Sequence, residues 1–80
     1  MTVDELNNVW LERNKPQSVI KIWSIKNVDF IYSSDDCERY DKTYNDVKDL
    51  KVKCFTTYHI EKPTDKNISI ITNYLIINVE

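Results

Sequence analysis

Two cysteines and one histidine are the only side chains that could bind a soft metal ion: Cys37, Cys54 and His59. Zinc sites usually draw their ligands from closely spaced pairs such as CxxC or HxxxH, and neither spacing occurs. Cys54 and His59 are five residues apart, so a strand would place them on opposite faces. The sequence therefore predicts no metal site, with Cys54 as a core side chain and His59 as a solvated strand residue.

Catalytic groups are equally sparse. The single histidine has no motif-bearing serine or cysteine near it in sequence. Asp35 and Asp36 are adjacent, so in most backbones their carboxylates diverge instead of converging on a substrate. The chain has no glycine, which excludes the glycine-rich phosphate cradles of common nucleotide-dependent enzymes. We therefore predict that the protein is not an enzyme and uses no cofactor.

One segment, Asp35 to Asp49, is distinctive in charge, because it holds six acidic and three basic side chains with two tyrosines among them. Tyrosine rings supply contact area at low entropy cost, and carboxylates steer a basic partner. The alternative interpretation is a solvated loop that keeps an acidic protein soluble. The predicted partner-binding residues are Asp35, Asp36, Glu38, Tyr40, Asp41, Tyr44 and Asp46.

Length and composition indicate the kind of protein that carries these residues. Eighty residues can enclose one core, so residues 1–80 are predicted to form a single domain. The net charge of −2 argues against a general nucleic-acid binder. No apolar run approaches the roughly 20 residues that cross a bilayer, and no signal peptide is evident. We expect a cytoplasmic protein, in its own cell or in an infected bacterial host, with reduced thiols.

A short helix is predicted at the N-terminus. Thr2 and Glu5 have the spacing of a capping box, which starts the helix at Val3, and Pro16 ends it near Asn14. Apolar residues recur at helical spacing along this stretch, so one face should pack on the rest of the domain.

A hairpin and an irregular segment should follow. Residues 18–25 and 28–32 are rich in β-branched and aromatic side chains, and Asn27 is expected at their tip because asparagine tolerates positive φ. Residues 33–49 are expected to be irregular apart from two short helical turns. The caps expected for these turns are Ser34 for the first, and Asn45 or Asp46 for the second.

The last two strands should form a second hairpin. Residues 50–60 alternate in polarity, with Val52 and Cys54 on one face, which predicts a half-buried strand. Residues 62–67 read as a loop. Residues 68–79 are apolar on both faces, which is typical of a central strand.

Together these elements predict an α+β fold. A short N-terminal helix should pack on a mainly antiparallel four-stranded sheet of two hairpins, with the C-terminal strand central. Trp10 and Trp23 are expected in the core, as large aromatic side chains usually are in so small a domain.

The order and pattern of four stretches, Met1 to Leu6, Ile20 to Tyr32, Asp46 to Phe55 and Leu75 to Glu80, resemble a group of short accessory proteins. These proteins come from phages and mobile elements of low-GC Gram-positive bacteria, and the class includes anti-CRISPR and other anti-defence inhibitors. The resemblance implies stoichiometric binding to a host protein complex, with an acidic surface over a nucleic-acid-binding site. It supplies no catalytic residues.

The leading hypothesis is therefore a non-enzymatic protein-binding protein. It would inhibit a host defence complex of the CRISPR-Cas type, or a nucleic-acid-handling complex, through the acidic tyrosine-containing surface and the adjoining strand edge. One alternative is self-association through an exposed edge strand, as in an assembly protein. The other is a small DNA- or RNA-binding regulator that uses a basic strand face. The residues of that face would be Lys51, Lys53, Phe55, Lys62 and Lys66.

Overall fold

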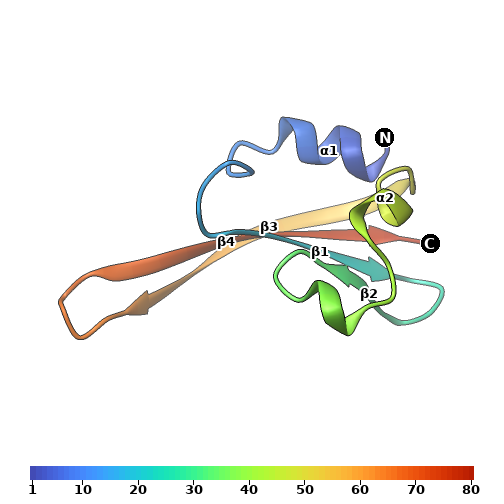
Figure 1. The fold of residues 1–80 in the computed structure, drawn as a ribbon. Helices are drawn as coiled ribbons and strands as arrows, with labels where there is room; N and C mark the ends of the chain where they lie inside the picture. The colour runs from blue at the N-terminus through green and yellow to red at the C-terminus, as the bar shows by residue number, and fades with distance from the viewer.

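The computed structural model describes residues 1–80 as two layers, a four-stranded sheet with two short helices on one face (Figure 1). The elements are α1 (Val3–Val9), β1 (Ser18–Ser24), β2 (Asp29–Ser33), the 3-10 turn η1 (Cys37–Arg39), α2 (Tyr44–Val47), β3 (Val52–Pro63) and β4 (Ser69–Val79). The predicted α+β class, with an N-terminal helix on a four-stranded sheet, is confirmed. No helix has the length and apolar character needed to span a bilayer.

Helix α1 begins as the sequence predicts. The Thr2 amide donates to the Glu5 carboxylate at 3.1 Å, and the Glu5 amide donates to the Thr2 hydroxyl at 3.2 Å. These two bonds form the capping box and satisfy two amides that the first turn leaves unpaired. The helix ends at Val9 and not near Asn14, because Trp10 takes an extended backbone and packs against the core, as predicted for its ring.

The strands lie in the order β2-β1-β4-β3. The pairs β1–β2 and β3–β4 are antiparallel, so both predicted hairpins are confirmed. The hairpins join through parallel pairing of β1 with β4, which runs from Ser18 beside Asn73 to Ser24 beside Val79. The C-terminal strand is central, as predicted, and the sheet is mixed because of this one parallel pair.

The hydrophobic core lies between the sheet and the helices. Its members are Val3, Leu6, Ile22, Tyr32, Val47, Leu75, Ile77 and Val79. Trp23 lies on the opposite, open face of the sheet, against Phe30, so the prediction that it is a core residue is wrong. The reason is strand alternation: its neighbour Ile22 points into the core, which turns Trp23 away.

The β1–β2 turn places its strained residue at an unexpected position. Val28 has a φ of 52°, whereas the sequence predicts positive φ at Asn27. A β-branched side chain in this region costs roughly 1–2 kcal/mol, since its Cβ crowds the following carbonyl. Val28 is 72% exposed, so little burial offsets that cost.

Val28→Asn is therefore expected to raise the free energy of unfolding by about 1 kcal/mol, because asparagine tolerates positive φ. Chemical denaturation measures the change. Val28→Ala is the matched control, since alanine keeps a Cβ in the same backbone conformation and should gain less. Equal gains for both variants would show that Val28 is not strained.

Strand β3 departs most from its prediction. A bulge between Val52 and Cys54 shifts the register against β4, so Val52 packs on the core while Cys54 lies on the open face. Cys54 is therefore exposed and not a core residue, and the Asn78 amide donates to its sulfur at 3.2 Å. From the bulge onward every residue of β3 is exposed. The prediction of a half-buried strand is wrong because no helix covers this strand.

The β3–β4 hairpin is longer than predicted. Its strands extend to Pro63 and from Ser69, so the expected loop is a short turn that contains Asn67 at a φ of 59°. Residues 69–71 of β4 are exposed, and only the C-terminal half of the strand is buried. The radius of gyration is 13.5 Å, whereas a compact chain of this length is expected near about 11.6 Å. The difference reflects the projecting hairpin in Figure 1.

Candidate functional site

The predicted acidic surface lies around η1 and α2, in the part of the chain that connects β2 to β3. Its first four carboxylates are all exposed: Asp35, Asp36, Glu38 and Asp41. The Ser33 hydroxyl donates to Asp35, which ties this carboxylate to the end of β2. Tyr40 is half-buried, with the Arg39 guanidinium 5.8 Å from its ring centre. This part of the segment is available to a partner.

Tyr44, by contrast, is committed to contacts inside the molecule. Its hydroxyl donates to the Asp4 carboxylate at 2.8 Å and accepts from the Asn7 side-chain amide at 3.2 Å. Its ring lies 6.1 Å from that of Tyr32. Burial, followed by the hydrogen bond to Asp4, raises the pKa of Tyr44. Tyr44 therefore fastens α2 to α1, a role that sequence reasoning missed.

Tyr44→Phe is expected to lower the free energy of unfolding by about 1–2 kcal/mol, because it removes two hydrogen bonds from a half-buried site and leaves the Asp4 carboxylate with only the Asn8 side-chain amide, at 3.4 Å. Thermal or chemical denaturation measures the loss. Tyr40→Phe is the matched control, since no hydrogen bond of the Tyr40 hydroxyl exists to be lost. If both variants unfold at the same denaturant concentration as the parent, Tyr44 does not hold the two helices together.

Asp46 also has a local structural role. Its carboxylate accepts from the Thr43 amide at 2.7 Å and from the Thr43 hydroxyl at 3.1 Å. These hydrogen bonds, the backbone one first, lower the pKa of Asp46. Thr43 therefore caps α2, not Asn45 or Asp46 as predicted, and Asp46 completes that cap.

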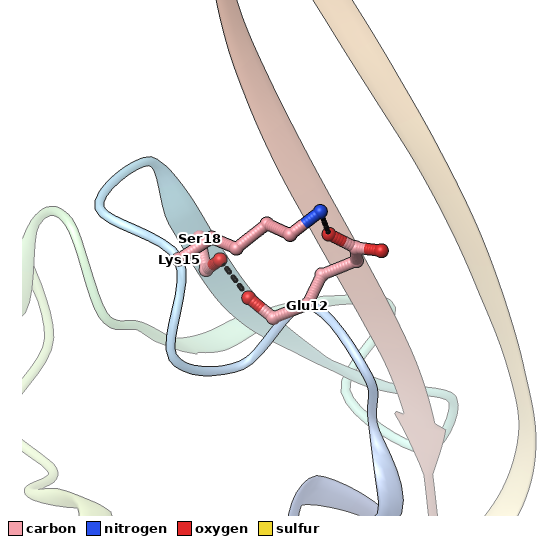
Figure 2. Close-up of polar contacts among 3 residues, drawn as sticks. All are labelled: Glu12, Lys15 and Ser18. Carbon is pink, nitrogen blue, oxygen red and sulfur yellow. Dashed lines mark hydrogen bonds and ion pairs between the residues drawn. The ribbon is translucent and has the colours of Figure 1, made fainter.

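Strand β4 pairs with β1 over only part of its length, and the loop between α1 and β1 fixes where that pairing begins (Figure 2). The Ser18 hydroxyl donates to the Glu12 carbonyl, and the Lys15 ammonium lies 2.6 Å from the Glu12 carboxylate. The Asn73 amide donates to the Gln17 carbonyl at 2.7 Å. Parallel pairing of β1 therefore reaches Asn73 and no farther toward the β3–β4 turn.

Beyond that point the hairpin forms an arm, residues 60–72 with Tyr58 and His59 at its base, in which β3 and β4 have only each other as neighbours. Figure 1 shows the arm projecting to the left of the two-layered body. Its exposed large apolar side chains are Tyr58, Ile60, Ile68, Ile70 and Ile71, each at least 41% accessible. The apolar character of residues 68–71, which the sequence analysis interprets as burial, therefore belongs to an exposed surface.

The outer edge of β3 is unpaired from residue 53 onward. The Thr64 amide donates to the Ile68 carbonyl within the hairpin. Because hydrogen-bonded pairs alternate along an antiparallel ladder, the backbone groups of even-numbered β3 residues bond to β4, and those of odd-numbered residues point away from the sheet. The outward amides are those of Phe55, Thr57, His59 and Glu61. Only the start of the strand is covered, where the Val52 amide donates to the Met1 carbonyl at 2.9 Å.

An apolar groove adjoins this edge on the helix side of the sheet. Its lining includes Leu6, Val9, Leu11, Phe55 and Leu75, around a cavity of about 480 Å³. Leu11 is 91% exposed and Phe55 is 51% exposed. The groove exists because α1 ends at Val9, which leaves the sheet beyond it without a covering helix.

Aromatic side chains on the open face hold the base of the arm. The rings of Tyr58 and Tyr74 stack at 4.8 Å across β3 and β4. The Lys21 ammonium lies 5.8 Å from the Tyr74 ring and 5.7 Å from that of Phe30 on β2. Cross-strand ring pairs and cation–π contacts stabilise a sheet beyond simple burial. The arm is therefore anchored at Tyr58, although its tip has no support.

The side chains that could bind a metal ion lie apart from one another. No three side chains of the metal-binding types converge anywhere in residues 1–80. His59 is exposed and lies on the opposite face of β3 from Cys54, as the spacing predicts. The arm, the open edge and the groove instead offer contact area and backbone hydrogen bonds.

The chain matches no protein-family profile, no curated protein and no solved structure at a significant level. The resemblance to phage and mobile-element accessory proteins therefore stays a prediction. The function has to be argued from the surface of this molecule.

Proposed function

We propose that this chain is a small non-enzymatic protein-binding protein that engages its partner through the arm and the outer edge of β3. The observation that carries the proposal is the exposed apolar surface of the arm. Monomeric proteins rarely expose large contiguous apolar patches, and where they do, the patch marks a site that binds a protein, a membrane or a ligand. Proteins commonly pair, cover or charge an exposed strand edge, because its free amides and carbonyls can bind another chain.

The amount of surface supports a partner of ordinary interface size. The accessible surface is 5883 Å², whereas a compact monomer of this mass should expose roughly 5,100 Å². The excess is about 800 Å², which is close to the area that each partner buries in a standard protein–protein interface. Only 11 of the 80 residues are buried, so the domain alone encloses a small core.

The mode of binding that fits is addition of a strand to β3. The four outward amides and their carbonyls can pair with an extended backbone, and the flanking side chains then select the partner. Phe55 on the helix side and Ile60 on the open side are exposed at positions where they would contact an added strand on both faces. This mode requires no chemistry from the protein.

The acidic segment is a second surface, and its role in binding stays a proposal. Carboxylates at Asp36, Glu38 and Asp41 can steer a basic partner without forming the main contact. On the resemblance alone, we propose that a host defence or nucleic-acid-handling complex supplies such a partner. The open face also bears aromatic rings, but the net charge of −2 favours a protein over a nucleic acid as the ligand.

The test is a capture experiment, in which the chain is immobilised and exposed at physiological salt to two separate samples. One sample is a solution of the same chain, and the other is a bacterial lysate. We expect at least one protein to be retained by the parent and lost in the variant Ile60→Lys with Ile70→Lys. Retention of no protein, or equal retention by parent and variant, would contradict binding through the arm.

A further inference from the structure

We infer that the partner of the β3 edge is a second copy of this chain, bound in antiparallel fashion about a twofold axis at Tyr58. This inference rests on the proposed function and names the partner of the same surface. The pairing would extend the sheet of each copy into one continuous sheet of twice the width.

The free edge has the symmetry that self-pairing requires. It runs from residue 53, just past the backbone covered by Met1, to Pro63, so its midpoint is Tyr58. Antiparallel pairing about this midpoint places Thr57 opposite His59 of the second copy and Phe55 opposite Glu61. All four are outward-facing residues, so every outward amide of both copies gains a carbonyl partner.

The side chains at the axis are also compatible. Tyr58 would face Tyr58 of the second copy as a close, non-hydrogen-bonded pair on the open face. Since Tyr58 already stacks on Tyr74, four tyrosine rings would form one row across the interface. Lys53, at the end of the free edge, pairs with Glu80 of its own chain at 2.7 Å, so no charge contact is assigned to the ends of the interface.

Each copy carries both halves of the contact between an arm and the start of β3. In this register the arm of one copy lies beside Phe55 and Thr57 of the other, where the apolar groove opens. On the helix face Glu61 and His59 of the arm would lie opposite Phe55 and Thr57, and on the open face Ile60, which is 41% exposed, would lie opposite Thr56 of the second copy. The contact is reciprocal, so it closes as a dimer and does not continue into a fibre.

The area agrees with a dimer of this kind. The excess surface of about 800 Å² per chain matches the share of one partner in a standard interface. A foreign strand on the same edge would pair with the amides, but it would not bring two copies of Tyr58 together on a twofold axis.

The first experiment is sedimentation velocity of the full chain over a range of micromolar concentrations. We expect a reversible dimer for the parent and for Thr57→Val, and a monomer for Thr57→Pro, whose dimer dissociation constant should rise at least about tenfold. Proline removes only an outward amide, as Pro63 already does at the end of the strand. Circular dichroism verifies that each variant is folded. A monomeric parent, or equal dimerisation of the two variants, would overturn the inference.

The second experiment tests the register with single cysteines, after Cys37 and Cys54 are replaced by serine. Tyr58→Cys should form a covalent dimer on mild oxidation, because only the residue on the axis faces itself. Thr56→Cys should not, since it would face Ile60 of the second copy. Crosslinking of Thr56→Cys but not Tyr58→Cys would overturn this register. If the own chain fails to bind while a lysate protein is retained through the arm, the inference falls and the proposed function stands.

Discussion

Leu75→Ala is expected to lower the free energy of unfolding by about 2–4 kcal/mol. Leu75 is fully buried at the centre of β4, where Ile20 of β1 and Thr57 of β3 are its neighbours in the sheet. Truncation removes apolar contacts and leaves a cavity that the two flanking strands prevent from collapsing. In a domain of this size the loss is a large fraction of the total stability. Chemical denaturation at low protein concentration measures it.

Ile70→Ala is the matched control, because it lies on the same strand and is 46% exposed. We expect its effect to stay below about 1 kcal/mol. A loss under about 0.5 kcal/mol for Leu75→Ala would contradict the central position of β4. Equal losses for both variants would show that the arm is as well packed as the core.

The variant Ile60→Lys with Ile70→Lys is expected to weaken protein binding by at least about 100-fold. Both side chains lie on the open face of the arm, at the diagonal positions that face Thr72 and Lys62 on the paired strand. A lysine buried at a contact must lose its water without gaining a counter-charge, which opposes association. The free energy of unfolding should barely change, since both positions are exposed in the free chain.

The acidic segment provides a comparison for this variant. Replacing four carboxylates by serine, at Asp35, Asp36, Glu38 and Asp41, should slow association in a salt-dependent way and leave dissociation nearly unchanged. If the serine variant abolishes binding while the arm variant does not, the arm is not the binding surface and the segment around η1 is. If neither variant affects binding, both surfaces are excluded.

Local signals explain why much of the fold could be predicted. The capping box at Thr2 and Glu5 is a short-range pattern, and it fixes the start of α1 in the structure as well. Alternation along residues 18–33 and 50–79 identifies the strands, and the doubly apolar C-terminal stretch identifies the central one. Each of these patterns depends on neighbours in sequence, which one chain displays directly.

Features that depend on distant parts of the chain could not be predicted in this way. The bulge at Lys53 places Val52 and Cys54 on opposite faces of the sheet. The sequence of the strand alone does not reveal where this bulge lies. The apolar residues of the arm have the sequence pattern of a buried strand. They are exposed because β1 pairs with β4 only as far as Asn73, and that limit depends on the tertiary structure. Tyr44 likewise gains its partners Asp4 and Asn7 only when α2 meets α1.

The sequence predicts binding through a strand edge but does not reveal the arm, for a related reason. Charge and aromatic content direct attention to residues 35–49, whose composition is unusual. The arm has an ordinary strand composition, and it becomes a candidate only because nothing covers it. The presence of isoleucine on both faces of residues 68–71 is the one signal that could have been weighed differently, since such a segment is either central or unpartnered.

The most direct measurement is residue-specific amide hydrogen exchange along β3, with the protein dilute and then bound to its partner. The four outward amides, of Phe55, Thr57, His59 and Glu61, should exchange rapidly in the dilute chain and become protected on binding. The inward amides of Thr56 and Tyr58, which bond to β4, serve as internal controls and should be protected in both states. Binding that leaves the outward amides unprotected would contradict an interface at the β3 edge.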